Sequence, residues 1–201
     1  MNESVDRRLW RGVVGLMALV LLAGLAFVSA LALGWNNPRP VRPPDWEAPG
    51  FPLDLSAAPN QAATLLLGHR NDDFTLEVAA HALAGSEFNG YGLVYRAQDA
   101  ARCYVFAVGS DGYYAVLLVN GPEELPLVDW QQFPHVRREQ QPNRLRVTCT
   151  GATCDFYIND EYAITIEDGT WLAGDVGLWV RSFTEEEATV HFSGVRVWDR
   201  E

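Results

Sequence analysis

The sequence predicts an all-β domain, a two-sheet antiparallel β-sandwich of the jelly-roll type, preceded by one N-terminal transmembrane helix. Three observations predict this fold class. An uncharged run of 21 residues lies near the N-terminus. After residue 60, apolar and polar residues alternate in short segments that are rich in β-branched and aromatic side chains. Turn residues separate these segments at short intervals.

The uncharged run, residues 13–33, is long enough to cross a membrane. As a helix it measures about 32 Å, against about 30 Å for the hydrocarbon core of a bilayer. Trp10 and Trp35 flank the run, as aromatic side chains do at membrane interfaces. More arginines precede the run than follow it, which favours a cytoplasmic N-terminus: Arg7, Arg8 and Arg11 before it, Arg39 and Arg42 after it.

A cleaved signal peptide is the alternative to a retained anchor. Ala30-Leu31-Ala32 offers the small-x-small pattern of a cleavage site, but the run is longer than the roughly 7–15 apolar residues of a signal peptide. We expect residues 1–12 to form a cytoplasmic tail and residues 13–33 a signal-anchor in the lipid bilayer. Under either alternative the rest of the chain lies outside the cytoplasm.

The exported part divides into a linker and a domain. Residues 34–59 are expected to form a proline-rich extracellular linker, because prolines cluster within "WNNPRPVRPPDWEAPG" (35–50). Proline at this density favours an extended spacer of the polyproline type. Residues 60–201 are long enough for one β-sandwich ectodomain with its own core.

The chain is acidic, with 26 Asp and Glu against 15 basic residues, all of them arginines, and a net charge of −11. Most of the acidic excess lies beyond Leu33. Nucleic acids and anionic lipid surfaces bind basic proteins, so we expect neither as a partner of the exported domain. Contact with the bilayer is expected only through residues 13–33.

About nine or ten strands are expected after residue 60. Between two of them, Gly109-Ser110-Asp111-Gly112 has the composition of a tight hairpin turn. Ser193-Gly194 interrupts the last alternating segment and predicts a β-bulge. The expected strands are residues 74–82, 91–97, 102–108, 113–119, 143–149, 154–159, 161–167, 174–183 and 188–198.

The segments "GYGLVYRAQD", "RCYVFAVGSDGYYAVLL", "NRLRVTCTGATCDFYINDEYAITIED", "GDVGLWVRS" and "VHFSGVRVW" follow one another in a familiar order. This ordered set resembles the concanavalin A-like lectin/glucanase jelly roll. It is most similar to the laminin-G-like branch related to 3-keto-disaccharide hydrolase domains. The resemblance spans residues 60–199, and it implies a fold shared by lectins, hydrolases and adhesion modules.

Cys149 and Cys154 end one expected strand and begin the next, so their side chains face each other across a hairpin. Outside the cytoplasm this pair predicts a disulfide. A zinc site lacks further ligands nearby, and a redox pair would have Cys-x-x-Cys spacing at a helix start. Cys103 is expected to be a small buried residue; its pairing with one of the other two, or with a cysteine of another chain, is the alternative.

The sequence gives little evidence for catalytic residues. Glucanases of the resembled family carry Glu-x-Asp-x-x-Glu on one strand, and this spacing is absent here, so no catalytic residue carries over. Glu185–Glu187 lie in an expected loop. Asn71–Asp73 offer oxygens to Ca²⁺, as in some laminin-G-like domains, but they also suit a turn before a strand. We therefore expect no cofactor.

A binding face is the stronger candidate. Alternation turns Trp179 and Arg181 away from the core, and Arg96 likewise on a strand that we expect beside theirs. Tyr114 and Trp130 also lie on this outer, concave side if their strands pair in one of the possible registers. Glycan sites typically contain aromatic rings that stack on sugars. They also contain arginine guanidinium groups that donate paired hydrogen bonds to hydroxyl or carboxylate groups. The alternative is that Trp179 merely covers the sheet under a loop.

Three functions fit these residues. The first is a membrane-anchored, extracytoplasmic, non-catalytic module that binds carbohydrate or another cell-surface ligand; it expects Trp179 or Arg96 to border a groove. The second is a glycan-active hydrolase, which needs two carboxylates or a metal in that groove. The third is a structural or protein-interaction ectodomain with an exposed apolar patch or sheet edge. A tail of residues 1–12 is too short to signal alone, so any sensing role would need a partner membrane protein.

Overall fold

The computed structural model of the chain describes residues 3–32 and 42–200, and within the first range it describes side chains from Trp10 to Ala30. The chain forms two compact units, one containing the helix and one containing the strands. Residues 33–41, which hold the first part of the expected linker together with Trp35 and Arg39, lie outside the described residues.

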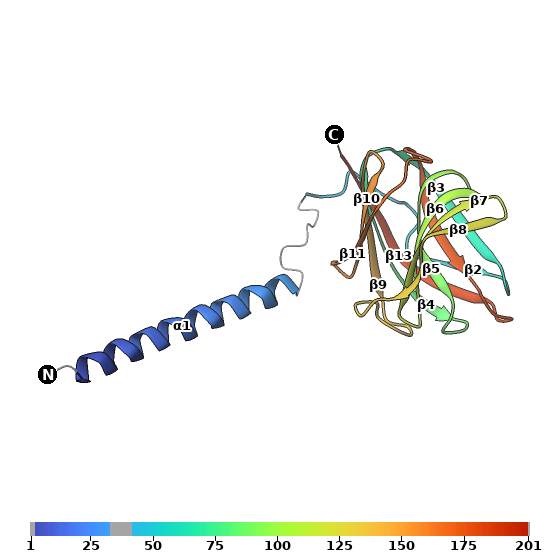
Figure 1. Cartoon of the computed structure of the whole chain (residues 1–201). Helices are drawn as coiled ribbons and strands as arrows, with labels where there is room; N and C mark the ends of the chain where they lie inside the picture. Colours follow the sequence, from blue (N-terminus) through green and yellow to red (C-terminus); the bar gives the residue numbers. More distant parts are fainter. Residues whose placement is uncertain (1–2, 33–41, 201) are drawn as a thin grey trace. The chain divides into compact units, whose positions relative to one another are not determined.

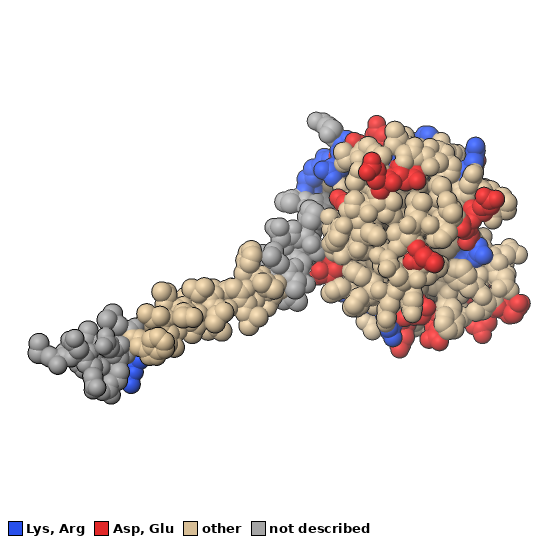
Figure 2. All heavy atoms as spheres, viewed as in Figure 1, with Lys and Arg blue, Asp and Glu red and all other residues tan. Residues whose placement is uncertain are grey.

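Helix α1 runs from Glu3 to Ala32 and contains one stretch, Trp10–Ala30, that is long and apolar enough to cross a membrane. Leu16, Leu19 and Leu22 are each about two-thirds exposed, so these apolar side chains have no protein partner within the unit. In Figure 2 the helix surface beyond its N-terminal end is free of charged side chains. This composition fits a single-pass membrane protein.

The described residues from 42 onward form two antiparallel sheets packed face to face (Figure 1). The seven-stranded sheet has the order β1-β13-β4-β9-β10-β11, and β2 also pairs with β13. Its strands are β1 Trp46–Glu47, β2 Leu53–Ala57, β4 Phe74–Ala84, β9 Asn143–Thr150, β10 Thr153–Ile158, β11 Glu161–Glu167 and β13 Ala188–Asp199. The fold class predicted from the sequence is confirmed.

The six-stranded sheet has the order β3-β12-β5-β6-β7-β8. Its strands are β3 Ala62–Asn71, β5 Gly90–Asp99, β6 Arg102–Gly109, β7 Tyr113–Asn120, β8 Glu123–Gln132 and β12 Gly174–Arg181. The turn between β6 and β7 is the predicted hairpin, closed by a hydrogen bond from the Gly112 N–H to the Gly109 carbonyl. Pairing of β12 with β5 places Trp179 beside Gly92.

Alternate residues of each strand meet between the sheets to form the core. Phe74 and Leu76 from β4 face Leu93 from β5 and Phe106 from β6, and all four are fully buried. Burying such side chains stabilises the fold by roughly 1.5–3 kcal/mol each. The period of two in the sequence therefore locates this core correctly.

The structure corrects the expected start of the domain. Strands β1 and β2 lie within residues 34–59, where a linker was expected, and both pair with β13 in the last part of the chain. They are too short for a period-two pattern to be detected among the prolines. At the other end, the register of β13 against β4 shifts between Phe192 and Gly194, which confirms the predicted bulge.

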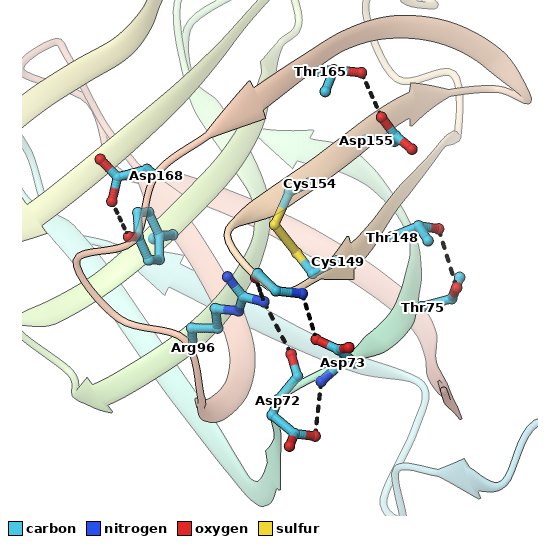
Figure 3. The surroundings of a disulfide bond; sticks show 12 residues. Asp72, Asp73, Thr75, Arg96, Thr148, Cys149, Cys154, Asp155, Thr165 and Asp168 are labelled. Atoms are coloured by element: carbon cyan, nitrogen blue, oxygen red, sulfur yellow. Dashed lines mark hydrogen bonds between the residues drawn. A yellow bond between two sulfur atoms is a disulfide. The ribbon is translucent and has the colours of Figure 1, made fainter. Parts of the chain in front are cut away.

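Cys149 and Cys154 face each other in the β9–β10 hairpin and form a disulfide, as predicted (Figure 3). Cys103 is free and buried, so its pairing with either of these two residues is excluded. The backbone N–H of Gly151, at the tip of the hairpin, donates to Asp73 Oδ1 at 2.7 Å. The stapled turn is therefore also tied to the β3–β4 connection, which joins the two sheets.

Replacing both cysteines by serine is expected to lower the free energy of unfolding by about 2 kcal/mol, because the disulfide closes only a short loop of the unfolded chain. Urea unfolding of the full-length variant, followed by circular dichroism, measures this loss. The wild-type chain after reduction is the control and should show a similar loss. A variant that fails to fold would show that the hairpin matters more than its loop length implies.

Candidate functional site

The outer face of the six-stranded sheet, turned away from the other sheet, is unusually well covered. Its floor consists of small and medium apolar side chains, and all of them are buried: Val94, Val105, Ala107, Ala115 and Leu117. Trp179 lies over this floor and is itself only 2% exposed. Large aromatic side chains therefore form a second layer on this face, outside the main core.

Three aromatic rings converge above Gly90 in β5. A Cβ at this position would lie 3.0 Å from Cζ3 of Trp179, 3.1 Å from Cη2 of Trp130 and 3.3 Å from Cε2 of Phe183. Glycine leaves the space that these rings occupy. The ring of Trp130 meets that of Phe183 edge-on, with centroids 5.8 Å apart at an interplanar angle of 90°.

An open hollow of about 290 Å³ lies beside these rings, and we call it the aromatic pocket. Its lining comes from four separate segments of the chain: Phe88, Gly109 to Tyr113 (Gly109, Asp111 and Tyr113), Trp130 and Phe183. Phe88, Phe183 and Tyr113 are 57%, 42% and 38% exposed, which is unusual for side chains of this size. Exposed rings around a hollow indicate a binding surface.

Asp111 supplies the one charged side chain among the residues that line the aromatic pocket. Its Oδ1 accepts a hydrogen bond from the Tyr113 backbone N–H at 3.3 Å, which shapes the β6–β7 turn. A carboxylate in this position accepts hydrogen bonds from hydroxyl groups, while the rings offer flat apolar faces. The pocket thus combines the two kinds of contact that a sugar needs.

Arg181 supports the pocket from outside it. Its Nη1 donates to Glu124 Oε1 at 2.5 Å, and its Cζ lies 5.3 Å from the centre of the Phe183 ring. Both members of the ion pair are partly buried. The arginine therefore holds Phe183 in place and gives its Nη1 donor to Glu124, while its buried Nε has no partner among the described residues.

The sequence placed Trp130, Trp179 and Arg181 on the outer face, and the structure puts them there. Trp130 lines the aromatic pocket, Arg181 lies behind Phe183, and Trp179 lies beneath the pocket, where it covers the sheet. The alternative interpretation of Trp179, as a covering side chain, fits its burial better than direct ligand contact. The expectation that Trp179 borders the groove is wrong.

Tyr114 does not lie on this face. Its ring is in the main core, its hydroxyl oxygen accepts a hydrogen bond from Gln131 Nε2 at 2.8 Å, and burial raises the pKa of the phenol. The neighbouring Tyr113 points into the aromatic pocket instead. The sequence prediction was wrong by one residue, because a shift of one position along a strand exchanges its two faces.

The alternation of apolar and polar residues also predicted the wrong position for the Arg96 side chain. Arg96 has a positive φ of 51°, and the register of β5 against β12 shifts between Val94 and Ala97, so a bulge turns its side chain away from the outer face. Its Nη2 donates to the carbonyls of Gly151 at 2.6 Å and Asp72 at 3.1 Å (Figure 3). Burial lowers the pKa of this guanidinium. Arg96 therefore fastens the stapled hairpin to the sandwich.

Five lining residues were missed as site residues from the sequence: Phe88, Gly109, Asp111, Tyr113 and Phe183. Each lies next to or within a connection at one end of the sandwich. The detectable signal is the pairing of an aromatic residue with a turn, in "EFNG", "SDGY" and "RSF". A large apolar side chain in a turn has little core to join, so it marks a candidate contact surface.

One side-chain oxygen of Asp72 and one of Asp73 accept hydrogen bonds within the protein, while Asn71 Oδ1 has no partner among the described residues. Asp72 Oδ1 accepts from the Asp73 N–H at 2.8 Å, and Asp73 Oδ1 accepts from the Gly151 N–H. In the described part of the chain, no group of three or more His, Cys, Asp or Glu residues has a geometry that would hold a metal. These side chains shape a turn, the second interpretation that the sequence allowed.

Cys103 lies in the floor of the outer face, where it is fully buried. Burial raises the pKa of its thiol to about 12, and the nearby Asp99 and Glu124 carboxylates add to this effect. A thiol with such a pKa is uncharged at neutral pH and is a poor nucleophile. It acts as a small apolar side chain under the second layer.

No family model matches the chain, and no curated protein matches it in sequence. Solved structures match its fold. A carbohydrate-binding module, CBM66 from Bacillus subtilis, superposes with a TM-score of 0.63 at 18% identity, covering 77% of this chain and 94% of that one. The domain is a lectin/glucanase-like jelly roll.

Two further structures share this jelly roll. A protein of unknown function from Saccharomyces cerevisiae has a TM-score of 0.57 at 16% identity, covering 79% of this chain and 94% of that one. A glycosyl hydrolase candidate from Parabacteroides distasonis has a TM-score of 0.52 at 11% identity, covering 74% and 81%. At these identities the comparisons establish the fold alone. The relation to 3-keto-disaccharide hydrolases stays a prediction.

Proposed function

We propose that this protein is a membrane-anchored, extracytoplasmic, non-catalytic module that binds carbohydrate through the aromatic pocket. Neither Trp179 nor Arg96 borders the hollow, so the criterion set for this function from the sequence is not met by those two residues. The proposal rests instead on other residues, the exposed rings around the hollow with Asp111 in its lining. Rings of this kind stack against the apolar faces of sugars, and the carboxylate accepts hydrogen bonds from their hydroxyl groups.

The shared fold supports the same conclusion. A carbohydrate-binding module covers most of this domain, and its own chain is covered almost completely. The sites on such folds, however, differ from one protein to the next. The proposal therefore rests on the residues of this pocket, and the fold raises its plausibility.

A hydrolase of the same fold is less well supported. Glycoside hydrolysis generally needs a pair of carboxyl groups on either side of the scissile bond. The described lining of the aromatic pocket contributes one, Asp111. The geometry therefore favours binding without bond cleavage.

The N-terminal unit and the disulfide support the proposed location. Helix α1 has the length and composition of a membrane span, and a disulfide persists outside the cytoplasm. We propose a cytoplasmic N-terminus, a retained anchor and an exported sandwich. Acidic side chains are scattered over the visible face of the sandwich in Figure 2, a surface that repels nucleic acid and anionic lipid.

A glycan array tests the function. The probe is the full-length chain in a detergent without a sugar head group, so that the detergent does not compete. The wild type should bind a defined class of sugars, and Tyr113→Ala should weaken this binding about tenfold through the loss of one stacking ring. Tyr162→Ala is the matched control, since Tyr162 is similarly exposed but lies on β11 of the other sheet.

Absence of binding by a chain that circular dichroism shows to be folded would reject the proposal. The exposed rings would then favour a protein-interaction ectodomain, the third function considered from the sequence. Equal weakening by both tyrosine variants would place the sugar site elsewhere on the domain.

A further inference from the structure

A second hollow, of about 210 Å³, opens on the other side of the β6–β7 turn. Residues 82–87 at the end of β4 line one side, Ser110 lines another, and Glu139 and Gln140 complete it. We call it the polar pocket. The proposed sugar site does not include it.

The two hollows share their dividing wall. Asp111 lines the aromatic pocket and its neighbour Ser110 lines the polar pocket. In the β4–β5 connection, Phe88 lines the first and its neighbour Glu87 lines the second. The hollows are therefore separated by the width of one backbone turn, so one extended molecule can reach both.

Two buried polar side chains at this wall lack hydrogen-bond partners. Ser110 is 5% exposed and Asn89 is 1% exposed, and neither the Ser110 hydroxyl nor either polar atom of the Asn89 amide has a partner among the described residues. Such groups are rare, because burial without a partner costs about 1–3 kcal/mol each. Of the two, Ser110 lines the polar pocket, so a rotation of its side chain is enough to turn the unpartnered hydroxyl toward a bound molecule.

The Asn89 amide lies behind the lining of the polar pocket. It packs against Gly85, a lining residue, so closely that a Cβ on Gly85 would collide with Nδ2. Gly85 has a φ of +106°, a conformation that glycine adopts most readily. The local backbone thus brings the amide of Asn89 up to the lining of this hollow.

The charged residues that line the two hollows have one sign. Glu87 and Glu139 line the polar pocket and Asp111 lines the aromatic pocket, and neither described lining contains an arginine or histidine. Carboxylates accept hydrogen bonds and repel anions. Hydroxyl and amine groups therefore suit this surface, and sugars with carboxylate or sulfate groups do not.

We propose that the polar pocket is a second subsite, which holds a hydroxyl- or amine-bearing sugar unit adjacent to the one in the aromatic pocket. The Ser110 hydroxyl is its hydrogen-bonding group, with the Asn89 amide behind the lining. The inference rests on the proposed function, since it extends the same site from one sugar unit to two.

The test compares matched monosaccharides and disaccharides. Titration calorimetry of the full-length chain measures galactose and lactose, xylose and xylobiose, and fructose and sucrose. At least one disaccharide should bind more tightly than its monosaccharide. Ser110→Ala should reduce that affinity ratio by about three- to tenfold, through the loss of one hydrogen bond. Ser193→Ala, which removes an exposed hydroxyl from the bulge in β13, should preserve the ratio.

Leu83→Trp provides a second variant. Leu83 is 40% exposed at the polar pocket, so a larger ring there should fill the hollow without entering the core. It should also reduce the affinity ratio. An affinity ratio that neither variant changes would overturn the second subsite and leave the sugar site intact. If none of the six sugars binds to the folded wild type, the proposed function itself fails.

Discussion

Replacing Trp179 by alanine is expected to lower the free energy of unfolding by about 3–5 kcal/mol, the range for removing a fully buried aromatic side chain. Its ring covers the floor of the outer face and supports Trp130 and Phe183 above Gly90. Sugar binding should weaken as well, because the aromatic pocket loses its support. Urea unfolding of the full-length variant, followed by circular dichroism, measures the stability.

Two variants separate support from ligand contact. Trp179→Phe should recover a large part of the stability and of the binding, since a smaller ring still covers the floor. Trp130→Ala should cost less stability, because Trp130 is only partly buried, yet it should weaken binding directly. If Trp179→Ala kept its stability within about 1 kcal/mol and lost binding, Trp179 would be a ligand contact after all.

The central strands could be predicted from the sequence because the alternation of apolar and polar residues indicates which side chains face the core. In β12, Val176, Leu178 and Val180 point inward and Trp179 outward, as a period of two requires. The disulfide followed from the same logic, since hairpin partners face each other. Edge strands were harder to predict: Pro126 and several acidic residues break the pattern of β8, and β1 and β2 are short.

The pocket itself depends on features that alternation does not contain. One extra residue in β5 moves Arg96 off the outer face, and one step in register separates Tyr113 from Tyr114. Phe88 and Phe183 come from connections whose positions are fixed by tertiary packing. The sequence thus predicted the correct sheet face for Trp130, Trp179 and Arg181, but of the five residues expected to bind ligand only Trp130 lines the pocket. Trp179 and Arg181 support it instead.

Replacing Arg96 by alanine is expected to lower the free energy of unfolding by about 3 kcal/mol. The change leaves the carbonyls of Gly151 and Asp72 without their charged donor, and a hydrogen bond to a charged group contributes about 1.5–3 kcal/mol. It also leaves a space in the protein, since Arg96 is 1% exposed. Chemical unfolding of the full-length variant measures the loss.

Arg102→Ala is the matched control, because Arg102 pairs with Asp99 at the surface and such pairs contribute at most about 1 kcal/mol. Arg96→Lys should fall between the two, since an ammonium keeps the charge but lacks the planar fork of the guanidinium. Folded Arg96→Ala protein should still bind sugar as the wild type does, because Arg96 lies outside the aromatic pocket. If Arg96→Ala lost sugar binding but kept its stability, Arg96 would belong to the binding face, as the sequence predicted. That result would contradict the conclusion that the bulge in β5 buries its side chain.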